Sequence, residues 1–272
     1  MKPVIRVASL RKSFRDRDGL PRAVLQNLDL TVCPGEFVCI LGPSGCGKST
    51  LLNVLAGLDK VYEGHASVNG GRVGYLFQEP RLLPWLTAER NLDFALSSCR
   101  VPASRWDELK SRYLSMTGLS DFRDYYPHQI SGGMAQRLAL ARALCVEPGV
   151  LLMDEPFSGL DEITARRMRS DLLSIWEETR KTIVFVTHNA YEASFLADRI
   201  LVMSAGAFRH EMQVSAGRPR SYDDPAIFQF SRDVIRAFGD ELDGEPERTA
   251  IPATASPFVD DLDRHTAVRM NN

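Results

Sequence analysis

Short runs of apolar and β-branched residues recur along the chain, and glycine-containing loops and segments of helical periodicity separate them. Uninterrupted apolar runs of this length are typical of strands that are buried on both faces of a sheet. The clearest of them predict strands at 37–41, 73–77, 150–153, 183–186 and 200–203. Because strands alternate with helical segments, the pattern predicts an α/β fold with a mostly parallel sheet covered by helices.

Two segments of helical periodicity are informative. Between positions 163 and 180, apolar residues recur at intervals of three and four, which predicts a helix that lies on the sheet. Those residues are Ala165, Met168, Leu172, Ile175 and Trp176. From about 79 to 139 the chain has helical patterns, such as 106–116, and no convincing strand. We therefore predict a helical subdomain, about 79–139, inserted between two strands of the sheet.

The end of the chain differs in composition from the rest. Beyond about Asp240 it is acidic, contains several prolines and has few periodic apolar residues. We therefore expect one main domain over 1–235, followed by a flexible acidic tail over 236–272. Regulation by a small molecule and simple disorder are both open as explanations of this tail.

Composition narrows the classes of partner. The 33 basic and 35 acidic residues nearly cancel, so no overall charge favours nucleic acid as a partner. The five cysteines are odd in number and form no CxxC pair, which indicates a reducing, cytosolic location. No stretch approaches the roughly 18 apolar residues that cross a bilayer, and the first residues lack the apolar core of a secretion signal. Any membrane role is therefore expected to depend on another chain.

A phosphate-binding loop follows the strand predicted at 37–41. The residues that match the pattern GxxxxGK[ST] are Gly42, Pro43, Ser44, Gly45, Cys46, Gly47, Lys48 and Ser49, and the helix-compatible run 50–56 begins directly after them at Thr50. Glycines let such a loop curl so that its N–H groups converge on phosphate oxygens. Lys48 is expected to reach the β and γ phosphates, and the Ser49 hydroxyl to bind Mg²⁺. The loop thus predicts ATP and Mg²⁺ as cofactors, and a turn that merely starts a helix is disfavoured by the matching strand and helix.

Polar residues follow two further predicted strands. Asp154 and Glu155 come directly after 150–153, and His188 follows 183–186. Ligands of parallel sheets sit at the carboxyl ends of the strands. We predict that Asp154 holds Mg²⁺, that Glu155 accepts a proton from the attacking water, and that His188 contacts the γ-phosphate. Taken alone, the two acids are equally compatible with solvated loop residues, and a lone histidine after a strand is usually a polar loop residue. The neighbouring phosphate loop favours catalysis for all three.

The segment Ile130, Ser131, Gly132, Gly133 and Met134, followed by Gln136, Arg137 and a helical ALARAL run, resembles the signature motif of ABC-transporter ATPases. Further segments resemble the family's other motifs in the family's order. They are Gln78 as the Q-loop, Asp154 and Glu155 as Walker B, Ser158 to Asp161 as the D-loop and His188 as the switch histidine. Phe14 resembles the aromatic residue that stacks on adenine, although packing is an alternative for it. The resemblance covers about 1–235.

Several expectations come from this resemblance and not from the residue pattern. It implies a P-loop NTPase core with an antiparallel β subdomain near the N-terminus. It also implies a head-to-tail dimer in which Ser131, Gly132, Gly133 and Met134 of one copy cap the ATP of the other, with Asp161 near the interface. Gln78 is expected near Mg²⁺ and the attacking water. Met134 and Ile130 replace the glutamine and leucine frequent in the family, whereas Ser131 to Gly133 are unchanged.

The runs QEPRLLPWLT, at 78–87, and RPRSYDDPAIF, at 218–228, resemble the subgroup that serves importers of nitrate, sulfonate and taurine. The resemblance implies an ATP-hydrolysing importer subunit at the cytoplasmic face of a bacterial inner membrane, acting on a small anion. Its partners would be a second copy, membrane-spanning permeases and, indirectly, an external binding protein, without nucleic acid. The apolar residues Leu82 to Trp85 suit either contact with the permease or local packing.

Three other functions would share some of these motifs. An ABC ATPase that acts on nucleic acid or the ribosome would show the same nucleotide motifs, but usually with a long coiled coil, a zinc module or a second cassette, which this sequence lacks. A small-molecule kinase would share Lys48 but does not need the signature and the D-loop together. A non-catalytic ATP-binding regulator would not need Glu155. Transport is favoured, and the transported molecule cannot be named from the sequence.

Overall fold

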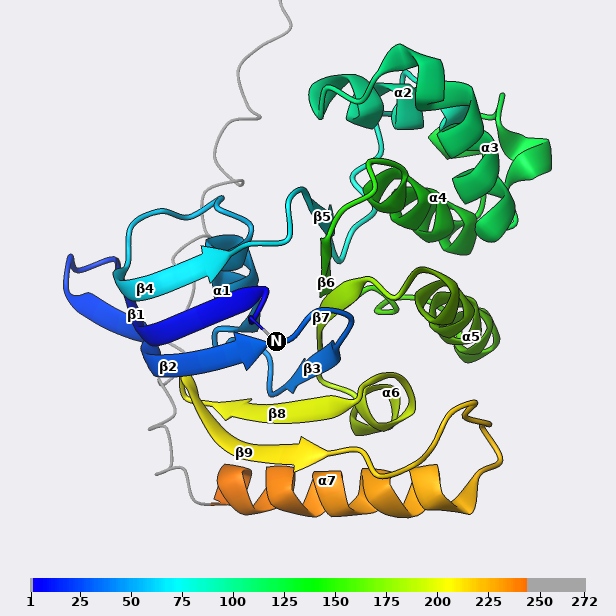
Figure 1. The fold of residues 1–272 in the computed structure, drawn as a ribbon. Coiled ribbons are helices and arrows are strands. Elements are labelled where there is room, and N and C mark those ends of the chain that lie inside the picture. The colour runs from blue at the N-terminus through cyan, green and yellow to red at the C-terminus, as the bar shows by residue number, and fades with distance from the viewer. Residues whose placement is uncertain (1, 244–272) are drawn as a thin grey trace, which may run out of the picture.

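The computed structural model describes residues 2–243, which form two sheets with helices packed on and between them (Figure 1). The larger sheet has the order β5-β6-β7-β3-β8-β9, and the smaller has the order β2-β1-β4. A group of helices that includes α2, α3 and α4 stands to one side of the larger sheet, at the upper right of Figure 1. This is the mixed, mostly parallel α/β architecture that the strand pattern predicts.

Five strands of the larger sheet are parallel, and the sixth, β9, runs antiparallel to β8. Their bounds are β3 (Phe37–Leu41), β5 (Val73–Leu76), β6 (Val150–Asp154), β7 (Thr182–Thr187), β8 (Arg199–Ser204) and β9 (Ala207–Gln213). All five predicted strands are confirmed, with ends that differ by at most one residue. The strand β9 was not predicted, because its burial is incomplete and its sequence carries several polar residues.

The central strand β3 shows why uninterrupted apolar runs mark this sheet. Its five residues are all fully buried. Phe37, Cys39 and Leu41 enter one hydrophobic core, whereas Val38 and Ile40 enter another on the opposite face. Successive side chains of a strand point to opposite faces, so a strand covered on both sides must be apolar at every position.

The smaller sheet covers one face together with a helix. It contains β1 (Ile5–Arg15), β2 (Pro21–Val32) and β4 (Glu63–Val68), all paired antiparallel. Helix α1 (Lys48–Leu55) buries Leu51, Leu52 and Val54 in the same core as residues of β1, β2 and the large sheet. The antiparallel subdomain that the family resemblance implies is therefore present.

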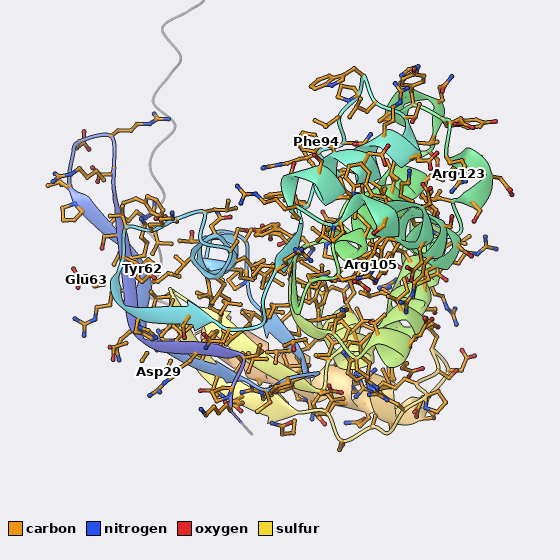
Figure 2. All side chains as sticks on the ribbon, turned by 45° about the horizontal axis from the view of Figure 1, so that its top comes forward. Asp29, Tyr62, Glu63, Phe94, Arg105 and Arg123 are labelled. Carbon is orange, nitrogen blue, oxygen red and sulfur yellow. The ribbon has the colours of Figure 1, made fainter. Side chains whose placement is uncertain are left out.

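The chain between β5 and β6 is helical, as predicted. It contains α2 (Ala88–Ser98), α3 (Trp106–Met116) and α4 (Gly132–Cys145), with short 3₁₀ turns at Ala103–Arg105, Ser120–Phe122 and Pro127–Gln129. The predicted helix 106–116 coincides with α3. In Figure 2 the labelled residues Phe94, Arg105 and Arg123 lie in this helical insertion, on the other side of the molecule from Asp29, Tyr62 and Glu63 of the smaller sheet region.

The remaining helices pack on the second face or edge of the large sheet. They are α5 (Glu162–Thr179), α6 (Ala190–Leu196) and α7 (Pro225–Asp243), the last of which lies along β9 in Figure 1. The five apolar residues predicted to face the sheet from α5 are all buried. None of the helices in the described part of the chain has the length and hydrophobicity that crossing a membrane requires.

The start of the predicted tail is helical. Ile227, Ser231 and Val234 are buried at spacings of four and three residues, and α7 continues from them to Asp243. The tail was expected to begin at 236, so its first eight positions belong to a helix instead of a flexible segment. The remainder, 244–272, lies outside the described residues, and the domain boundaries stay predictions.

A buried arginine fixes the end of α6. Arg220 Nη1 donates to the carbonyl oxygens of Ser194, Phe195 and Ala197 at 3.2, 3.0 and 2.7 Å, which satisfies the unpaired acceptors at the helix C-terminus. Burial, with a smaller contribution from nearby Arg218, lowers the pKa of Arg220 to about 10, so the guanidinium remains charged at neutral pH. Helix α6 begins directly after His188 and Asn189. By fixing the position of this helix, Arg220 also restrains the loop that carries His188.

Candidate functional site

The ends of three adjacent parallel strands bring the predicted site residues together. In the sheet register Leu41 of β3 is level with Thr187 of β7, and Asp154 of β6 is level with Val186. The residues that follow these strands therefore emerge at one edge. That edge is where open α/β sheets bind their ligands.

The phosphate loop adopts a conformation that depends on its glycines. Gly45 and Gly47 have φ angles of 81° and 111°, in the left-handed region that residues with a Cβ rarely occupy. A Cβ on Gly47 would lie 2.8 Å from the carbonyl oxygen of Val24, and a Cβ on Gly42 would overlap that of Met203. Gly47 immediately precedes α1, so the curled loop leads directly into the N-terminus of this helix. The first N–H groups of a helix have no internal partner and can donate to an anion.

Lys48 is held against the inner side of this loop. Its side chain is 4% exposed, and Nζ donates to the carbonyl oxygens of Gly42 and Pro43 at 2.8 and 2.9 Å. An ammonium group has three donors, so one remains for a further acceptor. The two backbone contacts fix the position of the charge without neutralising it, which suits a cation that is to meet a phosphate oxygen.

Ser49 and Asp154 form an oxygen pair beside the loop. Ser49 Oγ donates to Asp154 Oδ1 at 3.0 Å. Burial raises the pKa of the Asp154 carboxyl, and the hydrogen bond from Ser49 opposes part of that rise. A divalent cation at this place would favour the ionised carboxylate, and hydroxyl and carboxylate oxygens are suitable ligands for Mg²⁺. Within residues 2–243 no group of three or more His, Cys, Asp or Glu side chains could hold a metal alone. Such an ion would therefore need phosphate oxygens or water to complete its shell.

Glu155 lies between the side chains of Lys48 and His188. Its Oε2 is 3.0 Å from Nδ1 of His188, and its Oε1 is 3.6 Å from Nζ of Lys48. The Glu155 backbone has a φ of 41°, an uncommon value for a residue with a Cβ, while its N–H donates to Val186 O at 3.0 Å. Strained backbone of this kind concentrates at functional sites. The structure thus brings together Lys48, Glu155 and His188, which the sequence places in three separate motifs.

Phe14, the residue predicted to stack on adenine, lines the same hollow as the phosphate loop. An open hollow of about 920 Å³ is lined by Phe14, by residues of both arms of the β1–β2 hairpin and by Pro43 to Cys46 of the loop. Phe14 is 46% exposed, and Lys12 Nζ lies 4.7 Å from the centre of its ring. An exposed ring at the rim of such a hollow can stack on a base.

Gln78 and Ser131 each make a hydrogen bond outside the group of Lys48, Glu155 and His188. Gln78 Nε2 donates to Ser158 Oγ at 3.3 Å, and within the described residues no hydrogen bond joins it to Ser49 or Asp154. Ser131 is the N-cap of α4 and accepts from the N–H of Met134 at 3.2 Å. Gln78 thus contacts the D-loop segment through Ser158, and its role near Mg²⁺ stays a prediction.

A second hollow contains the signature segment. It is lined by Ser131, Gly133 and Met134 together with residues of α5, and it shares no lining residue with the hollow of the phosphate loop. Gly132 belongs to the same first turn of α4 and is exposed. Asp161, predicted near the dimer interface, is the exposed N-cap of α5 and accepts from Thr164 N at 3.0 Å. The chain therefore places its signature away from its own phosphate loop.

Several residues that support the site were not predicted from the sequence. Asn189 caps α6 by accepting from the N–H groups of Tyr191 and Glu192 at 2.9 and 3.2 Å. Glu192 is buried and accepts from Thr187 Oγ1 at 2.7 Å. Asn followed three residues later by Glu is a helix-start signal, so α6 and its cap could have been found from the sequence.

A curled glycine loop at a helix N-terminus, a buried lysine, paired carboxylates and a histidine at one sheet edge define a P-loop nucleotide hydrolase. The comparisons with known proteins narrow this class. A family model described as ABC transporter matches residues 25–158. A dimeric ATP-binding cassette solved in a post-hydrolysis state with ADP and Pi superposes with a TM-score of 0.70 at 30% identity, covering 78% of this chain and 100% of that one.

Curated relatives match over nearly their whole length. An uncharacterised ABC transporter ATP-binding protein of Methanocaldococcus jannaschii is 38% identical over 251 residues, 89% of this chain and 94% of that protein. An aliphatic sulfonates import ATP-binding protein of Burkholderia cenocepacia is 41% identical over 266 residues, 93% of this chain and 94% of that protein. The Bacillus subtilis protein of the same description is 38% identical over 241 residues, 85% of this chain and 92% of that protein. The chain therefore belongs to the family of ABC transporter ATP-binding proteins and is an ATPase. Its predicted resemblance to the sulfonate-import subgroup is confirmed.

The loop geometry separates two glycines, Gly45 and Gly47, that both have left-handed φ angles. Gly47→Ala should destabilise the fold and weaken ATP binding, because the new Cβ meets both an unfavourable φ, which costs about 1–2 kcal/mol, and the Val24 carbonyl. Gly45→Ala has the same backbone cost, but nothing lies within 4 Å of its Cβ. Thermal unfolding and titration with ATP should show the larger loss for Gly47→Ala. Equal losses in the two variants would contradict this account of the loop.

Proposed function

We propose that the protein is the ATP-hydrolysing subunit of an ABC importer that takes up a small solute, an anion such as nitrate, a sulfonate or taurine. The observation that carries the proposal is the constellation of Lys48, Asp154, Glu155 and His188 at one sheet edge of a chain similar over nearly its whole length to aliphatic sulfonates import ATP-binding proteins. Among these solutes, only the similarity to those relatives favours one that contains sulfur.

In this proposal the phosphate loop binds ATP through its N–H groups and the N-terminus of α1, from Gly42 to Thr50. Lys48 contacts the β and γ phosphates, and Phe14 stacks on adenine. Ser49 and Asp154 would hold Mg²⁺, which would offset the negative charge of the phosphates. The buried position of Lys48 strengthens its attraction to phosphate, because less water screens the charge.

Glu155 is the proposed general base. Its Oε2, 3.0 Å from His188 Nδ1, accepts a proton from the water that attacks the γ-phosphate. His188 keeps the carboxylate oriented and contacts the γ-phosphate. Gln78 is proposed to reach the metal and the attacking water after it leaves Ser158, so its present contact marks a resting position.

The signature segment supports a head-to-tail dimer. Ser131 and the N–H groups of Gly132, Gly133 and Met134 form an exposed helix N-terminus that can receive the phosphates of ATP bound to another copy. Asp161, at the exposed start of α5, would lie at the same interface. Each composite site then needs both copies, which links nucleotide binding to closure of the dimer.

The helical insertion is the proposed contact for membrane-spanning permeases. Trp85 and Phe94 are 70% and 53% exposed, which is unusual for such large apolar side chains. The segment leading to Trp85 is tied to α4, because Arg142 donates to the carbonyl oxygens of Pro80 and Arg81, both at 2.8 Å. The same helix begins with the signature, so dimer closure can move this surface. The protein would then work at the cytoplasmic face of the membrane and meet an external binding protein only through the permease.

An ABC ATPase that acts on nucleic acid or the ribosome is the alternative. The near balance of acidic and basic residues and the import relatives both favour transport. Purification of the tagged protein from its native cells distinguishes the two. Recovery of membrane proteins supports transport, whereas recovery of nucleic acid would overturn it.

Glu155→Gln should lower the steady-state rate of ATP hydrolysis by about 10²- to 10⁴-fold, because the amide cannot accept the proton, and should leave ATP affinity intact. Lys48→Ala should instead weaken ATP binding itself, because it removes the charge that faces the phosphates. Phosphate release and equilibrium titration measure the two effects. Near wild-type hydrolysis by Glu155→Gln would refute the assignment of the base.

A cysteine introduced at Trp85 should form crosslinks with a co-expressed permease. The experiment uses a Cys33→Ser background, because Cys33 is an exposed native thiol. A cysteine at Leu58, which is 64% exposed but lies in the loop after α1, is the matched control. Crosslinking at 85 and not at 58 supports the proposed surface, whereas its absence at 85 would count against it.

A further inference from the structure

A fully buried arginine has no role in the site described so far. Arg169 on α5 is 1% exposed, and its guanidinium contacts two carboxylates. Nη2 donates to Glu162 Oε1 at 2.6 Å, and Nη1 donates to Glu192 Oε1 at 3.3 Å. Nε donates to the carbonyl oxygen of Ala165, so each of these contacts restrains the side chain in one orientation.

Glu192 connects Arg169 to the loop that carries His188. Glu192 accepts from Thr187 Oγ1 at 2.7 Å, and the same hydroxyl accepts from the N–H of Asn189 at 3.0 Å. Thr187 and Asn189 flank His188 on either side. Burial raises the pKa of Glu192, while Thr187 and Arg169 favour its ionised form. The loop that carries His188 is therefore held by a hydrogen-bonded path that starts at Arg169.

Glu162, the second carboxylate that Arg169 contacts, lies at the surface. The side chain of Glu162 is 77% exposed, and Glu162 follows Asp161 at the start of α5. Its neighbour Ile163 is 71% exposed, which is high for an apolar residue. In the proposed dimer this end of α5 lies near the second copy. The two ends of the path are thus the proposed interface and the His188–Glu155 pair.

Fold stability is a weak explanation for this arrangement. Buried ion pairs can often be replaced by apolar residues without loss of stability, because removing charges from water is costly. A positioning role explains instead why the arginine bridges two segments that both serve the site.

We infer that Arg169 is a positioning residue that holds the His188 loop against the start of α5, so that contact with the second copy at Glu162 orients His188 on Glu155. The inference rests on the proposed function. It requires that the contact between Glu162 and Arg169 affects the rate of hydrolysis and not the binding of ATP.

The test compares Glu162→Ala with Glu178→Ala, using kcat and KM for ATP hydrolysis and the thermal midpoint. Glu178 lies at the other end of α5, is also exposed, and pairs with Arg112 at 3.0 Å, so its removal is a matched loss of one carboxylate and one ion pair. Glu162→Ala should lower kcat by about tenfold with KM changed by less than about twofold, because a misoriented catalytic group slows the chemical step. Glu178→Ala should match the wild type, and Glu162→Gln, which keeps an acceptor for Arg169, should restore part of kcat.

A second variant tests whether the fall in kcat comes from a loss of folding. Arg169→Met combined with Glu192→Gln removes both buried charges together and should show the same fall in kcat while remaining folded. An unchanged kcat in Glu162→Ala, or an equal fall in Glu178→Ala, would overturn the inference and leave the proposed function intact. A wild-type protein that binds ATP but never hydrolyses it would overturn the proposed function itself.

Discussion

The parallel register of β3, β6 and β7 is the constraint on which the site depends. Backbone hydrogen bonds hold the ends of these strands level, so the phosphate loop, Asp154 and the His188 loop leave the sheet at one edge. A slip of one residue would turn Asp154 to the opposite face of the sheet. The two hydrophobic cores on either side of β3 oppose such a slip, since it would exchange the side chains that each core buries.

Under the proposed function, the same architecture leaves the site incomplete within one chain. The catalytic side chains gather at the sheet edge, whereas the signature starts α4 in a separate hollow. Helix α4 also holds the chain on both sides of Gln78. Gln136 donates to the carbonyl oxygen of Phe77 before it, and Arg142 donates to those of Pro80 and Arg81 after it. One rigid helix therefore connects the proposed ATP-capping residues, the Q-loop and the exposed surface around Trp85. Under the proposed function, this connection would be the physical basis for coupling hydrolysis to transport.

The sequence predicted those parts whose signals are local. Strands buried on both faces are apolar throughout, so all five were found, and the phosphate loop was found from its glycines and Lys48. The strands β1 and β2 gave no clear pattern because bulges interrupt their register, and only the family resemblance implied them. The helical start of the tail was missed because the buried residues that mark α7 where burial is described, Ile227, Ser231 and Val234, all precede position 236. Contacts such as Gln78 with Ser158 and Arg169 with Glu192 join residues far apart in the chain, so no local pattern could reveal them.

The central claim is that the site is completed by a second copy of the chain. It is tested most directly by the molar mass of the Glu155→Gln protein in solution, measured by light scattering with and without ATP and Mg²⁺. The account predicts a dimer that forms only when nucleotide is present and that is lost when Ser131→Arg is added to the same chain. A protein that stays monomeric with saturating ATP, or a dimer that ignores Ser131→Arg, would contradict it.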